Sequence, residues 1–190
     1  MPTASAAAAK ASAAPTPERL RQVFDLLKRH IEKRWGIPVV LADVPAPFTG
    51  DLDGAEIKVD WENDPEEALF ILVHLFGHTV QWNVSPAARE LGAAVEQNPT
   101  PEKIDQLERY EEEACRYSLQ LLHEAGVFDL DGWLADFSRC DFAYLRYFYE
   151  TGQKADPRSF WQAGTPPLAP LAIPHFEPTR WKARWQGIVI

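Results

Sequence analysis

The chain has 190 residues, and 46% of them are hydrophobic, which is the composition of a globular protein large enough to enclose a core. Its formal net charge of −9 at pH 7 excludes the broad basic surface that nucleic-acid-binding proteins use, so we expect no nucleic-acid partner. The apolar run at 68–73 is too short to cross a bilayer, so we expect no membrane partner. Two cysteines without a paired framework, and no signal-peptide-like apolar segment near residue 1, predict a cytoplasmic protein.

The first part of the chain alternates between disorder, helix and short strands. Residues 1–16 are Ala-rich and of low complexity, and this composition predicts a disordered tail because it offers no large apolar groups to bury. A helix is predicted over 17–35, where a Thr–Pro pair provides the cap and first position and apolar residues recur at helical spacing. Two short strands are predicted at 39–41 and 55–61, separated by turns rich in Pro and Gly.

The second part is predicted to be mostly helical and ends in an irregular segment. Pro and aromatic residues dominate after position 155, which favours an extended arm that wraps around the domain and could dock a partner. The predicted helices are 65–82, capped by Asn63 or Asp64, then 87–95, 101–126, 128–137 and 141–149, and a final strand is a candidate at 187–190.

The helix at 65–82 is apolar on almost every side, which is typical of a buried helix, yet it carries His74 and His78. Residues four apart lie on the same face of a helix, and Glu67 and Gln81 fall within about 20° of His74 on that face. Two neutral imidazoles at this spacing can bind one metal ion together. The stripe therefore predicts a metal site on a buried helix.

A third ligand is predicted from the helix at 101–126. Of its three consecutive glutamates, Glu111 falls on the apolar face between Leu107 and Ala114, whereas the next two fall well off it. A buried carboxylate requires a partner or a metal ion. Three protein ligands with an open fourth position are typical of catalytic zinc, although iron and manganese accept the same donors. The alternative is a metal-free core in which the histidines form hydrogen bonds to Glu111, Gln81 or the backbone.

These two segments resemble the IrrE/ImmA-like zinc metallopeptidases. The run FILVHLFGH at 70–78 is similar to their H-E-x-x-H helix, EEEACRYSLQLL at 111–122 is similar to their E-x-E-A-x-x-F-A-x-x-L-L segment, and the preceding strand also fits. The resemblance spans roughly residues 19–126 and implies an α+β fold: a mostly helical zincin-like domain with a small sheet next to the metal-site helix. It implies zinc bound by His74, His78 and Glu111. Composition and patterning, not the resemblance, divide the chain into a tail at 1–16, a domain at 17–155 and a C-terminal arm at 156–190 that we expect to pack on the domain.

The chain departs from that family at Leu75, where the peptidases have the glutamate that activates the metal-bound water. A leucine cannot accept a proton, and the loss of a positioned base typically lowers the rate about 10²–10⁴-fold. Replacement candidates are Gln81, which can orient a water but cannot act as a base, and Glu112, His175 or Glu177, which would have to approach the metal. Glu67 is a poor substitute because it lies about 10 Å from His74 along the helix.

Three functional hypotheses follow. The first is an inactive, peptidase-like protein that keeps a metal site for binding or regulation, and Leu75 favours it. The second is a metal-dependent hydrolase whose base has moved to another residue. The third is a metal-free structural or interaction protein whose aromatic C-terminal arm docks a protein or peptide partner.

Overall fold

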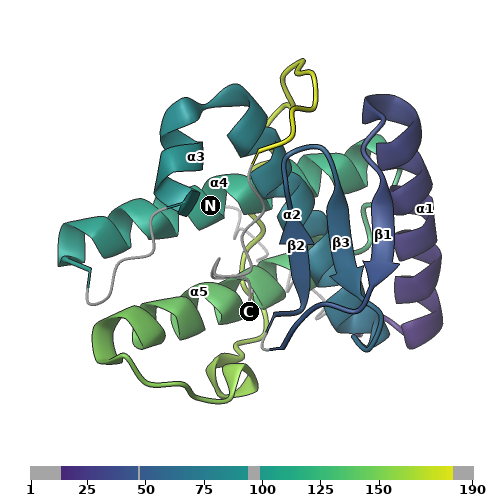
Figure 1. The fold of residues 1–190 in the computed structure, drawn as a ribbon. Helices are drawn as coiled ribbons and strands as arrows, with labels where there is room; N and C mark the ends of the chain where they lie inside the picture. The colour runs from purple at the N-terminus through teal and green to yellow at the C-terminus, as the bar shows by residue number, and fades with distance from the viewer. Residues whose placement is uncertain (1–13, 47, 94–98, 182–190) are drawn as a thin grey trace, which may run out of the picture.

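The computed structural model describes residues 14–46, 48–93 and 99–181 (Figure 1). Within these ranges the chain forms five α-helices and a three-stranded sheet, so the predicted mostly helical α+β fold is confirmed. No described helix combines the length and the apolar character needed to cross a membrane. The elements are α1 (Pro17–Trp35), β1 (Val39–Ala42), β2 (Gly50–Leu52), β3 (Ile57–Asp60), α2 (Pro65–Val84), α3 (Pro86–Ala93), α4 (Pro101–Glu124), α5 (Asp131–Thr151) and the 3-10 helix η1 (Pro157–Phe160).

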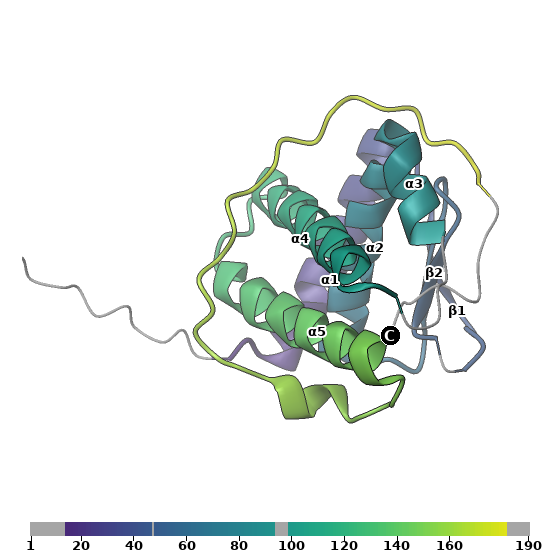
Figure 2. The same cartoon turned by 90° about the vertical axis from the view of Figure 1, so that its left-hand side faces the viewer.

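Helix α2 is the centre of the molecule. Every residue from 69 to 82 is buried, because the sheet covers one side of the helix while α1, α4 and α5 cover the others (Figures 1 and 2). The side chain of Asp64 accepts hydrogen bonds from the amides of Glu66 and Glu67, and this cap fixes where the helix begins. The prediction of a buried central helix is therefore confirmed.

The sheet has the order β1–β3–β2, with β1 parallel and β2 antiparallel to β3. The sequence predicted turns around residues 50–54, so the strand β2 was missed. A strand of three residues is too short to show an alternating pattern. Its position depends on Gly50, where a Cβ atom would lie 2.6 Å from Ile71 Cγ2 and 2.8 Å from Leu75 Cδ1. The missing side chain lets β2 lie directly on α2.

Helix α5 is continuous, which corrects the predicted pair of helices at 128–137 and 141–149. No Gly or Pro interrupts the chain from Trp133 to Thr151, so nothing breaks the helix between the two predicted segments. The helix ends at Gly152, whose φ of 68° is a left-handed conformation that glycine adopts readily. The wrong division hid the inward-facing stripe of α5, which includes a residue of the candidate site.

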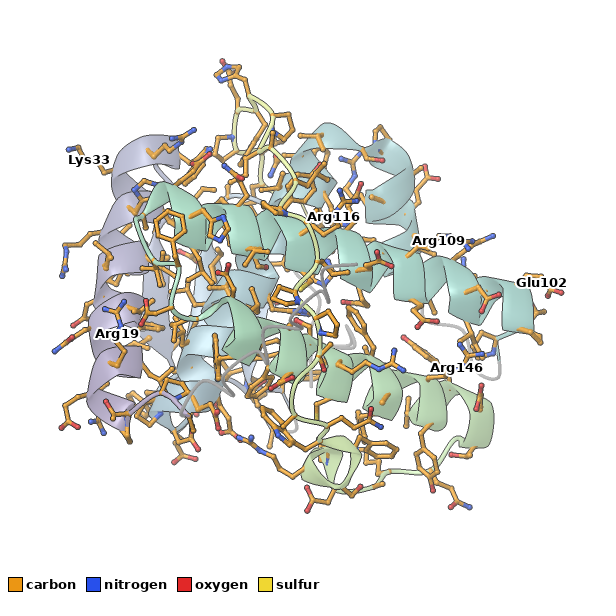
Figure 3. The ribbon with its side chains drawn as sticks, turned by 180° about the vertical axis from the view of Figure 1, so that it is seen from behind. Arg19, Lys33, Glu102, Arg109, Arg116 and Arg146 are labelled. Carbon is orange, nitrogen blue, oxygen red and sulfur yellow. The ribbon has the colours of Figure 1, made fainter. Side chains whose placement is uncertain are left out.

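The described part of the C-terminal arm, residues 161–181, has no regular secondary structure and crosses the outer side of α4 (Figures 2 and 3). Arg116 of α4 fixes it, because the Arg116 side chain donates to the Ala169 carbonyl and its backbone carbonyl accepts from the Leu171 amide. Further along, Trp181 lies beneath the guanidinium of Arg89, 3.5 Å from the ring centroid. The candidate strand at 187–190, most of the predicted tail and the end of the predicted helix at 87–95 lie outside the described residues.

Candidate metal centre

The candidate site forms where α2 and α4 cross at very close range. A Cβ atom on Gly77 would lie 2.8 Å from the carbonyl carbon of Ala114 and closer still to its oxygen, so only glycine permits this approach. One turn away, the Ser118 hydroxyl donates to the Val73 carbonyl at 2.7 Å, which joins the two backbones. The crossing brings the histidines of α2 within reach of Glu111 on α4.

Three ligand atoms meet at this crossing. The distance between Nε2 of His78 and Nε2 of His74 is 3.1 Å, and Glu111 Oε2 lies 2.9 Å from the former and 3.6 Å from the latter. A triangle with these sides has a point about 1.9 Å from all three corners, close to the distance of about 2.0–2.2 Å at which zinc binds nitrogen and oxygen. All three residues are buried, and this group could hold a metal ion.

Gln81 determines which nitrogen of His78 carries its proton. The Gln81 amide nitrogen donates to the Tyr110 carbonyl at 2.8 Å and to Glu113 at 2.7 Å, so its oxygen must face His78 Nδ1, 2.8 Å away. Because that oxygen can only accept, Nδ1 donates. In neutral His78 the Nε2 lone pair therefore points at the other two ligand atoms, as metal binding requires.

Without a metal, one proton holds this group together. Burial lowers the pKa of His74 to about 3, and the charge of His78 lowers it as well. The negative charge of Glu111 opposes both effects but is weaker. Burial alone would also lower the pKa of His78, but its attraction to Glu111 and its hydrogen bonds to Glu111 and Gln81 together raise it. Burial would raise the pKa of Glu111, yet the interactions with His78 lower it. The metal-free site is therefore an ion pair of His78 and Glu111 beside a neutral His74.

Such a proton satisfies fewer groups than a metal ion would. The hydrogen on His78 Nε2 can be donated to Glu111 Oε2. The Nε2 atoms of the two histidines, 3.1 Å apart, then have no hydrogen between them unless His74 Nε2 carries one. A cation at the shared point accepts a lone pair from each of the three atoms. The donor set and its convergence therefore fit a divalent metal ion.

Aromatic rings enclose the two histidines. Tyr110 stacks on His78 with ring centroids 4.6 Å apart, and Trp82 donates to the Tyr110 hydroxyl and so fixes that ring. Phe70 stacks on His74 at 5.3 Å. These rings exclude water from the sides of the imidazoles and leave little freedom in their orientation.

Leu75, the position of the expected catalytic glutamate, is fully buried. Its side chain packs under the backbone of β2 at Gly50, so the strand occupies the space into which a base at residue 75 would project. A carboxylate at this position would therefore be packed against the strand and out of contact with water.

The other predicted base candidates lie elsewhere in the structure. Glu112 is half-buried and lines a surface groove between α3 and α4. His175 and Glu177 are exposed on the arm, on either side of Phe176, which packs on Trp35 of α1. Of the candidates from the sequence, Gln81 is the one that the fold brings into contact with a predicted ligand.

Asp141 of α5 belongs to this environment, and the sequence analysis missed it. The residue is partly exposed, yet the surrounding protein desolvates its carboxyl group and raises its pKa to about 8. The negative charge of Glu111 acts in the same direction, and His78 opposes it. Within the described part of the chain, the Asp141 carboxyl group has no hydrogen-bond partner. A helical wheel over residues 131–151 would have put Asp141 beside Phe137 and Tyr144 on the inner face.

Comparisons with known proteins returned no match, whether against family models, curated proteins or solved structures. The resemblance to the IrrE/ImmA-like peptidases therefore depends on the two motifs alone and stays a prediction.

Proposed function

We propose that this protein is a metal-binding, peptidase-like protein without peptidase activity, which holds one zinc ion through His74, His78 and Glu111 and acts in binding or regulation. The observation that carries this proposal is the convergence of the three ligand atoms on one point between α2 and α4. Two imidazole nitrogens and one carboxylate oxygen form a set that zinc accepts in a tetrahedral site with one open position.

The chain's own residues account for the binding part of this proposal. Gln81 orients His78, Tyr110 and Phe70 confine the rings, and the close crossing at Gly77 fixes the distance between the two helices. A bound zinc ion supplies Lewis acidity and one site for an outside ligand. Because the proposed ligands come from both α2 and α4, metal binding and the stability of the fold would be linked.

The absence of peptidase activity follows from Leu75 and its surroundings. A leucine cannot accept a proton, and its position under β2 excludes water. Gln81 already uses both ends of its amide to hold His78, Tyr110 and Glu113, and an amide is not a base. The three proposed metal ligands converge, while the position at which the resembling family has its base is filled by core packing.

Metal analysis tests the proposal. Protein purified without a His-tag and dialysed against zinc is expected to contain about one zinc per chain by mass spectrometry of the metal. His78→Ala and Glu111→Gln are expected to reduce this at least tenfold, because the loss of a ligand leaves two. His175→Ala is the matched control, since His175 is exposed on the arm and its loss should leave the zinc content unchanged. A wild-type protein that takes up no zinc, iron or manganese would refute the proposal.

A metal-dependent hydrolase is the second candidate, and Asp141 is the observation that favours it. Its carboxyl group has no hydrogen-bond partner among the described residues, and the charges of Glu111 and His78 both shift its pKa, so it is our candidate for a general base near the proposed metal. The zinc-loaded protein should be assayed against mixed peptide and ester substrates, together with Asp141→Asn and His74→Ala. Turnover by the wild type that both variants abolish would establish the hydrolase, and no turnover would leave the binding function.

A further inference from the structure

A pocket of about 280 Å³ lies between α2 and α5, beside the candidate metal centre. Helix α2 contributes Glu67, Phe70 and Ile71, which share one face because they are spaced three and four residues apart. Helix α5 contributes Asp141, and the segment that follows it contributes Trp161. Beyond the pocket, the same face of α2 continues to His74, on which Phe70 stacks. Its volume equals that of about nine water molecules, which suits one amino-acid side chain or a small ligand.

The wall of this α2–α5 pocket is a continuous series of aromatic rings. The Phe70 ring stacks on His74 at 5.3 Å and on Phe137 at 4.1 Å. Phe137 in turn meets the edge of Trp161 at 5.8 Å. The faces of such rings carry partial negative charge and attract cations. A ligand in the pocket would therefore lie along an aromatic surface that extends from the metal centre to the exterior.

The pocket also carries more acidic than basic side chains. Its acidic residues are Glu67, Asp141 and Asp156, and its cationic residue is Arg158. Arg158 is already engaged by an ion pair with Glu66 at 2.8 Å. Its charge also interacts with that of Glu67, so one cation faces three acidic side chains in the pocket.

Arg158 shows what kind of group the pocket mouth accepts. Its guanidinium lies over the rings of Phe137 and Trp161, at 5.1 and 5.5 Å from their centroids. The chain itself therefore places an organic cation on this aromatic wall at the outer end. At the inner end stands the Asp141 carboxyl group, which has no hydrogen-bond partner among the described residues. This carboxyl group lines the pocket and is therefore available to the cationic head of a ligand.

We propose that the α2–α5 pocket binds an organic cation, a primary amine or guanidinium on an apolar stem, with its head at Asp141 and its stem along Phe70 and Phe137. This proposal deepens the proposed function by naming the ligand class of the site, and it rests on that function only in placing the ligand beside a metal ion. The cation has two sources, a free small amine or the lysine or arginine side chain of a peptide. Both present the same chemistry to the pocket.

Ligand titration followed by NMR tests the proposal on the full chain, with the Trp161 indole signal identified by Trp161→Phe. The probes are n-hexylamine, agmatine and blocked lysine and arginine amides, and the matched neutral probes are n-hexanol and blocked norleucine amide. We expect the cations to shift the Trp161 signal with a dissociation constant at least tenfold lower than that of the neutral probes. Tighter binding of the blocked amino acids than of the free amines would identify a peptide side chain as the source, and the reverse a small amine.

Two variants and a metal measurement separate the possible failures. Asp141→Asn is expected to weaken cation binding at least tenfold, whereas Asp105→Asn, which removes an exposed carboxylate from α4, should leave it unchanged. Equal binding of neutral and cationic probes, or no effect of Asp141→Asn, would overturn the pocket proposal even if zinc is bound. Zinc content is measured on the same samples, so a protein that binds cations but no metal would refute the proposed function and keep this inference.

Discussion

Replacement of Gly77 by alanine tests whether the close crossing of α2 and α4 creates the metal site. The new Cβ would lie 2.8 Å from the Ala114 carbonyl carbon and closer to its oxygen, whereas ordinary contact begins at 3.4 Å. The contact is with backbone, which cannot rotate away, so the helices must separate by about 1 Å. A metal site tolerates deviations of only about 0.2 Å in its ligand distances. The methyl group should therefore move Glu111 out of the position at which it shares a metal with the histidines.

The magnitude has two opposing parts. Overpacking of a core typically destabilises a protein by about 1–3 kcal/mol, and a clash with backbone belongs at the upper end. The better helix propensity of alanine returns about 0.5–1 kcal/mol. We therefore expect the free energy of unfolding of the metal-free protein to fall by about 2 kcal/mol, and zinc affinity to fall about 100-fold through the displaced ligand.

Urea unfolding in the presence of a chelator and zinc competition with a coloured chelator measure the two effects separately. Gly132→Ala is the matched control, because a Cβ at Gly132 of α5 meets no other atom within 4 Å. That variant should be unchanged or more stable by up to about 1 kcal/mol, with normal zinc affinity. A Gly77→Ala protein with the unfolding midpoint and zinc affinity of the wild type would refute the argument that the crossing sets the site.

Three further predictions concern single residues around the site. In metal-free protein the pKa of Asp141 is raised to about 8, so the native state keeps a proton that the unfolded state loses above about pH 4. The free energy of unfolding should therefore fall as the pH rises from about 4 to about 8, by at most about 1.4 kcal/mol per unit of pKa difference. Urea unfolding at pH 5 and 8 measures this fall, and Asp141→Asn should remove it. Gln81→Leu should weaken zinc binding about 10–100-fold in chelator competition, because His78 loses the acceptor that fixes its proton. Gln81→Glu keeps an acceptor and should retain most of the wild-type zinc affinity. Equal zinc affinities in the wild type and both variants would contradict this role of Gln81. Leu75→Glu should lower the melting temperature strongly and add no peptidase activity, because the carboxylate would be buried under Gly50. Leu75→Met should melt within a few degrees of the wild type. New activity in a stable Leu75→Glu protein would show that the site is open.

The buried centre of the fold was predictable because its signals are local. The predicted cap at Thr16 accepts a hydrogen bond from the first turn of its helix, and of the two predicted caps for α2, Asn63 and Asp64, Asp64 is the one that does so. The inward direction of Glu111 followed from helical periodicity alone, and the structure buries it as expected. Local periodicity decides which face of a helix is apolar, and for this reason the three candidate ligands were found before any contact between helices was known.

Features that depend on contacts between distant segments were not predictable. The strand β2 was missed because it owes its existence to pairing with β3 and to the absence of a side chain at Gly50. The division of α5 was wrong because aromatic clusters at its two ends resembled separate helices. That error concealed Asp141, which lines the pocket between α5 and α2, a position that its own neighbours in the chain do not reveal.

The sequence by itself determined that a buried helix carries two histidines at metal spacing and that an inward glutamate follows on a later helix, because both are properties of one helix's periodicity. The tertiary structure alone decided that the three groups converge, since their distances depend on how closely α2 and α4 cross at Gly77. It also decided what surrounds them: β2 over Leu75, Gln81 behind His78, and Asp141 at the end of an aromatic pocket. Packing between elements sets distances, burial and access, and no single segment of the chain encodes these quantities.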